Sequence, residues 1–253
     1  MKLSEALDVP EAGIITAVGA GGKTSLLLSL ANEWRERKDP FLLTTTTKMF
    51  FRQVQNLQPV MCGDYERGVR YLRKILERHG FASWFARWRG TKVDGVPARW
   101  LDQFFQTNLV PHIFVEGDGA RRKLIKAPAP HEPVVPCFNR LTLGVLNLGV
   151  LGFALAPRHV HRPEILARLL NKSLGDTIEV KDIALLAGHK RGIFKGAPGG
   201  GKVLVLTGVN RKNVSSGEEI LEYLPTANEV GIKRCVLLEG FGKNMQVIEV
   251  FEL

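Results

Sequence analysis

Seven consecutive residues, Gly19 to Ser25, have the types needed to hold a phosphate: GAGGKTS. Small residues let backbone N–H groups point at phosphate oxygens, and the N-terminus of a following helix adds partial positive charge. In such a loop the lysine reaches the β- and γ-phosphates, and the next hydroxyl binds the bridging Mg²⁺. We therefore predict a nucleotide site formed by Gly19, Ala20, Gly21, Gly22, Lys23, Thr24 and Ser25. Lys23 is also a predicted catalytic residue and Thr24 a predicted metal ligand.

The loop departs at one position from the usual G-x-x-x-x-G-K-[ST] pattern, because Ala17 stands where the first glycine is expected. The shortened loop is similar to that of the Mur-type peptide ligases. A glycine-rich turn with a solvated lysine is the alternative interpretation. An apolar run before the loop (14–18) and a helix-like run after it (25–37) favour the phosphate loop.

Two carboxylates follow the apolar run 113–115. Phosphate-loop proteins use an acidic residue at the end of such a strand to hold Mg²⁺ directly or through water, and Glu116 and Asp118 both qualify. Side chains two residues apart on a strand point the same way, so both can face one crevice. We predict both as catalytic and metal-binding residues; an acidic turn is the alternative.

Four basic side chains come next: Arg121, Arg122, Lys123 and Lys126. They could receive an anionic second substrate or counter charge in a transition state. His131 and Glu132, in a proline-rich loop, could transfer protons. We predict catalytic roles for Arg121 and His131; a solvated basic loop is the alternative.

A threonine cluster, TTTTK at 44–48, ends the predicted strand 41–46. The carboxyl ends of parallel strands converge on a ligand crevice, so this cluster is expected beside the phosphate loop. We predict that Thr46 and Lys48 contribute to the nucleotide site. The preference of threonine for strands is the alternative explanation.

The elements that must position these residues alternate between strands and helices. This pattern predicts a three-layer α/β fold with a mainly parallel sheet of the phosphate-loop NTPase type. Strands are expected at 14–18, 41–46, 59–62, 113–115, 134–137, 141–148, 203–207, 234–238 and 247–251. Helices are expected at 25–37, 64–79, 97–106, 163–170, 180–186 and 215–224. We predict one domain over 1–253 with a small insertion around 81–99, which includes a turn at Asp94 and Gly95.

The composition fits an ordinary globular protein: 45% of the 253 residues are hydrophobic and 24% are charged. The net charge of +10 favours anionic partners. The basic residues form pairs and triplets without a long tail or zinc-finger spacing, which argues against nucleic acid as the partner. Because there is neither a signal-peptide pattern nor an apolar run of bilayer length, we expect a cytoplasmic protein without a membrane partner.

Four segments together resemble a known family, the selenium-dependent hydroxylase accessory proteins, also called YqeC-like. They are GAGGKTS, TTTTK, VEGDGARRKLIKAPAPHEPVVP (115–136) and HRPE (161–164). The resemblance implies a phosphate-loop protein that helps to mature a molybdenum hydroxylase or to supply its cofactor. Gly117 replaces an expected alanine, and VLTGVN (205–210) stands where a base-reading asparagine–lysine segment is expected, so ATP and GTP both stay open.

The sequence thus predicts a Mg²⁺-dependent accessory protein that binds ATP or GTP, acting as an NTPase or as a phosphoryl or nucleotidyl transferase. Its expected partner is an anionic second substrate or the apo form of a molybdenum hydroxylase that is selenium-dependent. One alternative is a small-molecule kinase or Mur-like ligase acting on an anionic metabolite. Another is a non-catalytic basic scaffold that binds an apo-enzyme or nucleic acid.

Overall fold

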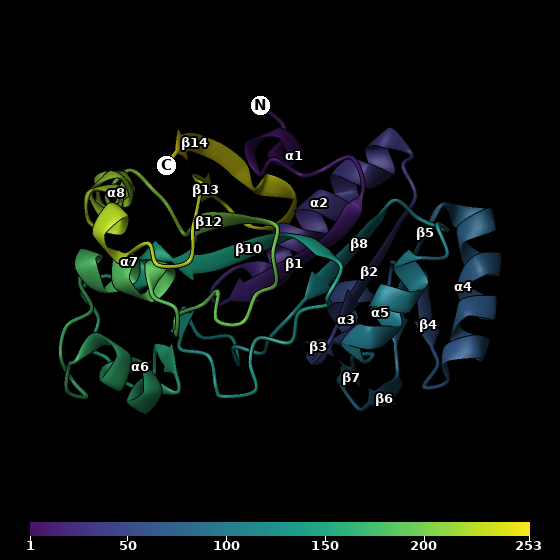
Figure 1. The fold of residues 1–253 in the computed structure, drawn as a ribbon, viewed down its shortest axis with the longest axis horizontal. Coiled ribbons are helices and arrows are strands. Elements are labelled where there is room, and N and C mark those ends of the chain that lie inside the picture. Colours follow the sequence, from purple (N-terminus) through teal and green to yellow (C-terminus); the bar gives the residue numbers. More distant parts are fainter.

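A nine-stranded sheet forms the centre of the computed structural model, which describes residues 1–253 except the side chain of Lys243. The strand order is β14-β13-β12-β10-β1-β8-β2-β5-β4 (Figure 1), and every neighbouring pair is parallel except β13 and β14. The strands are β1 (Gly13–Gly19), β2 (Phe41–Thr45), β4 (Pro59–Met61), β5 (Phe81–Phe85), β8 (His112–Glu116), β10 (Asn139–Asn147), β12 (Gly201–Thr207), β13 (Arg234–Glu239) and β14 (Gln246–Glu252).

Helices cover both faces of this sheet. They are α1 (Leu3–Ala6), α2 (Lys23–Arg37), α3 (Phe51–Val54), α4 (Tyr65–His79), α5 (Ala98–Phe105), α6 (Pro163–Leu170), α7 (Val180–Gly188) and α8 (Val214–Ala227). On one face α1, α2 and α3 share a core with the sheet. On the other face α6, α7 and α8 pack over β10, β12 and β13, and α4 and α5 pack over β2, β4 and β5. The predicted three-layer, mainly parallel α/β architecture is confirmed.

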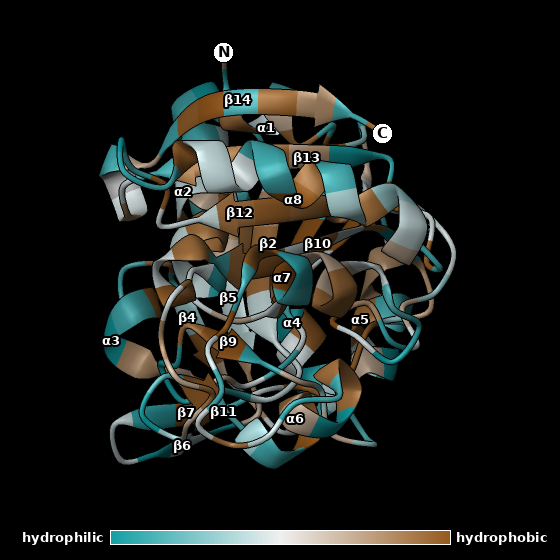
Figure 2. Ribbon diagram, turned by 90° about the vertical axis from the view of Figure 1, so that its left-hand side faces the viewer, coloured by the Kyte–Doolittle hydropathy of each residue, from teal (hydrophilic) through white to brown (hydrophobic). Residues whose placement is uncertain are grey.

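The hydrophobic pattern of β1 explains its central place. Ile14 and Val18 point to one face of the sheet and Ile15 and Ala17 to the other, and all four are fully buried. A strand covered on both faces needs such a continuous apolar run. Figure 2 shows the same apolar colouring in other strands of the sheet, such as β12.

One predicted strand is wrong. The segment 134–137 forms no strand and instead lies as an extended loop after β9 (Ile125–Lys126), which pairs with β11 (Val160–His161). Pro133 precedes the segment and Pro136 lies within it, and a proline has no N–H to donate to a ladder. Val134 instead contacts two other loops, because its N–H donates to the Gly117 carbonyl and its carbonyl accepts from Thr46.

The excursion expected around 81–99 is narrower in the structure. β5 belongs to the central sheet, and only β6 (Arg87–Arg89) and β7 (Lys92–Asp94) leave it. These strands pair with β3 (Lys48–Phe50) in a small three-stranded sheet. The turn lies at Gly90 and Thr91 and not at Asp94 and Gly95, since Asp94 pairs within the ladder and Gly90 adopts the positive φ of 60° that a tight turn favours.

In the part of the chain that the structure describes, no helix has both the length and the apolar character needed to cross a bilayer.

Gly68 on α4 packs tightly against the Trp84 side chain of β5. A Cβ atom there would lie 2.5 Å from Cζ2 of Trp84. The Trp84 ring cannot move away, because it is fully buried, stacks on Trp100 at 5.5 Å and donates its N–H to Cys62. Overpacking costs about 1–3 kcal/mol, whereas alanine gains only about 1 kcal/mol of helix propensity over glycine.

We therefore expect Gly68→Ala to lower the free energy of unfolding by about 1 kcal/mol, measured by urea denaturation. Lys74→Ala, at an exposed position of the same helix, is the control and should leave this free energy nearly unchanged. A Gly68→Ala protein more stable than the wild type would contradict the packing described here.

Candidate functional site

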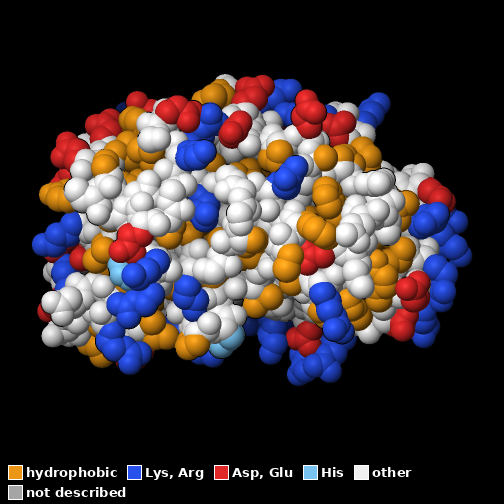
Figure 3. Space-filling model, viewed as in Figure 1, with side chains coloured by type: hydrophobic (Ala, Val, Ile, Leu, Met, Phe, Trp, Pro, Cys, Tyr) orange, Lys and Arg blue, Asp and Glu red, His pale blue; other side chains and the backbone are white. Residues whose placement is uncertain are grey.

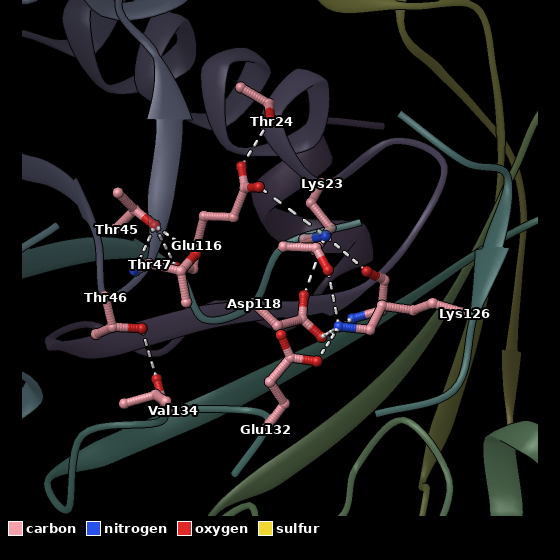
Figure 4. Close-up of polar contacts among 12 residues, drawn as sticks. Lys23, Thr24, Thr45, Thr46, Thr47, Glu116, Asp118, Lys126, Glu132 and Val134 are labelled. Carbon is pink, nitrogen blue, oxygen red and sulfur yellow. Dashed lines mark hydrogen bonds and ion pairs between the residues drawn. The ribbon is translucent and has the colours of Figure 1, made fainter. Parts of the chain in front are cut away.

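Three neighbouring parallel strands bring the predicted chemical residues together. The phosphate loop begins at the end of β1, Glu116 ends β8 with Asp118 shortly after it, and the threonine cluster lies at the end of β2. The register places Ala17 of β1 and Thr45 of β2 on either side of Glu116. Figure 4 shows the side chains of Lys23, Thr24, Glu116 and Asp118 gathered at this point, from segments almost a hundred residues apart.

The backbone of the phosphate loop is fixed against β10 and β12. Gly19 has a φ of 93°, and a Cβ atom there would lie 2.3 Å from the carbonyl oxygen of Val145, so only glycine fits. The N–H of Ala20 donates to the same carbonyl. Asn147 Nδ2 and Thr207 Oγ1 donate to the Gly21 carbonyl at 2.9 and 2.7 Å.

Sequence reasoning missed Asn147 and Thr207. Each is the last residue of a buried strand, β10 or β12, and that position was the one signal that could have identified them.

Lys23, at the start of α2 directly after Gly22, is almost completely buried, with a relative exposure of 4%. Its Nζ donates to the Gly19 carbonyl at 2.6 Å and lies 3.0 Å from Asp118 Oδ1 and 3.9 Å from Glu116 Oε1. Burial alone would lower the pKa of Lys23, but the charges of Asp118 and Glu116 outweigh it and raise this pKa. The ammonium is therefore held charged beside two carboxylates.

Thr24 and Glu116 form the pair that best fits a metal ion. The Thr24 hydroxyl donates to Glu116 Oε2 at 2.6 Å. Burial raises the pKa of Glu116, against the opposing effects of Lys23 and Thr24. Among the described residues, no group of three or more His, Cys, Asp or Glu side chains is arranged as a metal cage. A hydroxyl and one or two carboxylates fit a Mg²⁺ that also takes oxygens from water and from phosphates.

Asp118 connects the phosphate loop to the segment 119–132. It is 1% exposed, and its Oδ2 accepts from the Gly19 N–H and lies 3.0 Å from Lys126 Nζ. Lys126 is fully buried and also donates to Glu132 Oε2 at 2.7 Å and to the Gly119 carbonyl at 2.9 Å. Its ammonium faces these groups instead of the solvent, and the binding of a second substrate by Lys126 stays a prediction.

Glu132 receives two cations, Lys126 and Arg162. Burial would raise its pKa, but the hydrogen bonds from Arg162 and Lys126 prevail and lower it from 4.5 to about 2. The carboxylate thus stays ionised at neutral pH, and proton transfer by Glu132 stays a prediction. Glu132 anchors the loop after Asp118.

A cleft of about 950 Å³ opens beside these residues, and we call it the central cleft. Gly21, Gly22, Lys23, Thr24, Ser25, Lys48, Glu116, Arg121 and His131 line it. Lys48, Arg121 and His131 are exposed within it. Thr46 does not line the central cleft. Its hydroxyl donates to the Val134 carbonyl, and its N–H donates to the Glu116 carbonyl. Its contacts join the acidic segment to the loop after it.

The pKa of Glu132 leads to a prediction about acid stability. A carboxyl whose pKa is lower in the folded than in the unfolded state stabilises the fold above the unfolded value, and this contribution is lost as the pH falls toward the folded value. For Glu132 the window is from 4.5 to about 2. Glu132→Gln removes the carboxylate that pairs with Arg162 and one of the two that pair with Lys126, so at neutral pH it should lower the free energy of unfolding by about 3 kcal/mol.

The difference in free energy of unfolding between Glu132→Gln and the wild type should shrink as the pH falls from 4.5 to about 2. Urea denaturation at several pH values measures this difference. Glu77→Gln, at an exposed position on α4, is the control. A difference that stays constant over the whole range would contradict the assigned role of Glu132.

Comparison with known proteins identifies a family and a weak structural likeness. The solved structure of chloroplast FtsY from Physcomitrella patens aligns with a TM-score of 0.43 and 15% identity, over 96% of this chain and 64% of that chain. The uncharacterized protein YqeC of Escherichia coli (strain K12) is 33% identical over 187 residues, 74% of this chain and 72% of the relative. The family model described as YqeC protein matches residues 15–164. The chain therefore belongs to the YqeC family.

Proposed function

We propose that this protein binds ATP or GTP with Mg²⁺ and acts as an NTPase or as a phosphoryl or nucleotidyl transferase. The observation that carries the proposal is the convergence of Lys23, Thr24, Glu116 and Asp118 at the ends of β1 and β8, where a glycine loop opens α2. A loop of small residues, a lysine, a hydroxyl and strand-end carboxylates are the parts that phosphate-loop enzymes use.

The contacts of Lys23 indicate how a nucleotide would be received. Its ammonium now faces Asp118 and Glu116, and a phosphate group entering the loop offers a competing anion at the N-terminus of α2. Asp118 would keep Lys126 and the Gly19 N–H when Lys23 turns toward the phosphate. The move therefore leaves no carboxylate uncompensated at Asp118, which lowers its cost.

Thr24 and Glu116 would hold Mg²⁺, with Asp118 as a further carboxylate nearby. When bound, the ion supplies neutralisation of phosphate charge. The residues of the chain contribute mainly by orienting the phosphates and stabilising charge. Arg121 at the edge of the cleft would counter charge on a second substrate, and His131 would exchange a proton with it.

The finer part of the proposal concerns the biological setting. We propose that the chain acts as one domain and serves the maturation of a molybdenum hydroxylase that is selenium-dependent, with its apo form as partner. This part is supported by the sequence resemblance at 19–25, 44–48, 115–136 and 161–164. The cationic lining of the central cleft is compatible with an anionic cofactor or substrate.

A second candidate is a small-molecule kinase or Mur-like ligase, favoured by the shortened loop and by Arg121 and Lys48 in the same cleft as the phosphate loop. ADP release stimulated by an anionic metabolite, with no protein partner added, would select this candidate. Stimulation by an apo-hydroxylase alone would select the accessory role.

Lys23→Ala is the first test of the nucleotide site. We expect the wild type to bind MgATP or MgGTP in equilibrium titration and the variant to show no measurable binding, because the loop loses the cation that reaches the phosphates. Circular dichroism should show that the variant is folded, and Lys74→Ala on α4 should bind like the wild type. Unchanged affinity of Lys23→Ala would refute the phosphate-loop assignment.

Thr24→Val tests the metal role separately. Valine keeps the shape of threonine but removes the hydroxyl that contacts Glu116. We expect nucleotide affinity to fall by roughly tenfold with Mg²⁺ present and to change little in EDTA, since only the metal-dependent part uses the hydroxyl. An equal loss under both conditions would show that Thr24 acts on the loop and not on the metal.

A further inference from the structure

The small sheet of β3, β7 and β6 has two chemically different faces. Side chains alternate along a strand, so the middle residue of each strand points away from its two neighbours. The middle residues of β3 and β7, Met49 and Val93, are buried in the core shared with α2. The first and third residues of the three strands lie on the other face and line the central cleft: Lys48, Phe50, Arg87, Arg89, Lys92 and Asp94.

The register arranges these six side chains in two rows. Asp94 of β7 lies between Lys48 of β3 and Arg87 of β6, and Lys92 lies between Phe50 and Arg89. We call this six-residue surface the cationic face. It carries four cations and one carboxylate, and Figure 3 shows Lys and Arg side chains gathered at the lower edge of the molecule, over β6 and β7.

Internal contacts hold the cationic face in place without neutralising it. Arg87 Nε and Arg89 Nε both donate to Asp94 Oδ2 at 2.6 Å, so two guanidinium groups share one carboxylate. Lys92 Nζ lies 4.7 Å from the centre of the Phe50 ring, and the guanidinium carbon of Arg122 lies 4.2 Å from the same centre. Cation–π contacts orient a cation but leave its charge.

We propose that the cationic face is the binding site for a second ligand, a small molecule that carries at least two phosphate groups. Preoriented guanidinium groups bind phosphate oxygens in pairs. Four cations and one carboxylate leave the face with more positive charge than a single phosphate group, which carries about −2, can neutralise. This inference rests on the proposed function in one respect, because the second ligand is taken to bind beside a nucleotide in the central cleft.

The position of the cationic face favours a small molecule over a macromolecule. It lies on the wall of the cavity that also contains Lys23 and Thr24. The volume of about 950 Å³ is near the upper end of the roughly 300–1,000 Å³ of ordinary small-molecule sites, so the cleft has room for a ligand beside a nucleotide. A nucleic acid or protein surface would instead need an open, extended array of charges.

The test uses the full chain without nucleotide and fructose bisphosphate as the probe, titrated by calorimetry at low salt. Arg87→Gln/Arg89→Gln removes two cations from exposed positions, and Arg73→Gln/Arg78→Gln removes two exposed cations from α4, outside the cleft. We expect the affinity for fructose bisphosphate to fall roughly tenfold or more in Arg87→Gln/Arg89→Gln. In Arg73→Gln/Arg78→Gln it should change less than about twofold. Citrate, measured in parallel, distinguishes phosphate from carboxylate recognition.

Lys23→Ala separates this inference from the nucleotide site. We expect it to keep probe binding while it loses MgATP and MgGTP binding, and we expect Arg87→Gln/Arg89→Gln to show the reverse. If the wild type binds no nucleotide but its probe binding depends on Arg87 and Arg89, the proposed function fails and the cationic face stands.

The assignment of the cationic face would be overturned if the wild type bound no fructose bisphosphate, or if the two double variants weakened its binding equally. Tighter binding of citrate than of fructose bisphosphate would also overturn it. So would much tighter binding of a single-stranded oligonucleotide that is lost in Arg87→Gln/Arg89→Gln.

Discussion

The site depends on the ion pairs that the carboxylate of Asp118 forms with two buried lysines. Two buried ammonium groups, Lys23 and Lys126, lie within 3.0 Å of its oxygens, and the Gly19 N–H donates to it. A buried lysine without a counter-charge would cost several kcal/mol, on the order of 3–5. Asp118 therefore allows both lysines to be charged inside the protein. It also joins the end of β1 to the segment after β8, which is why the phosphate loop and the acidic segment occupy fixed relative positions.

The parallel sheet supplies this arrangement through its register. β1 and β2 flank β8, so whatever follows these three strands meets at one edge. The small sheet extends the same edge, because β3 begins three residues after β2 and its partners β6 and β7 follow β5. Nucleotide site and cationic face are thus both consequences of strand order. The apolar underside of the small sheet, Met49 and Val93, anchors the second of them in the main core.

Local sequence patterns were enough to predict those features of the site that depend on residues close together in the chain. Lys23 and Thr24 follow a strand and open a helix, and Glu116 ends the apolar run of β8, so their meeting point could be inferred from the sheet type. Contacts between distant segments could not be inferred. Asn147 and Thr207 hold Gly21 over more than a hundred residues of chain, and β3 pairs with β7 over some forty residues. The ion pairs of Glu132 with Lys126 and Arg162 could not be inferred either, because no local pattern indicates which side chains meet in a loop.

The two hydrogen bonds to the Gly21 carbonyl have a consequence for the kinetics of association. A glycine-rich loop that is disordered before its ligand arrives loses backbone entropy at about 1–2 kcal/mol per residue on binding. In this chain Asn147 and Thr207 already fix Gly21, and Ala20 is bonded to Val145. The loop is preorganised, so a nucleotide meets a formed backbone and displaces chiefly one side chain, Lys23. Entry of the anion then becomes an exchange of ionic partners, sensitive to ionic strength, instead of a folding event.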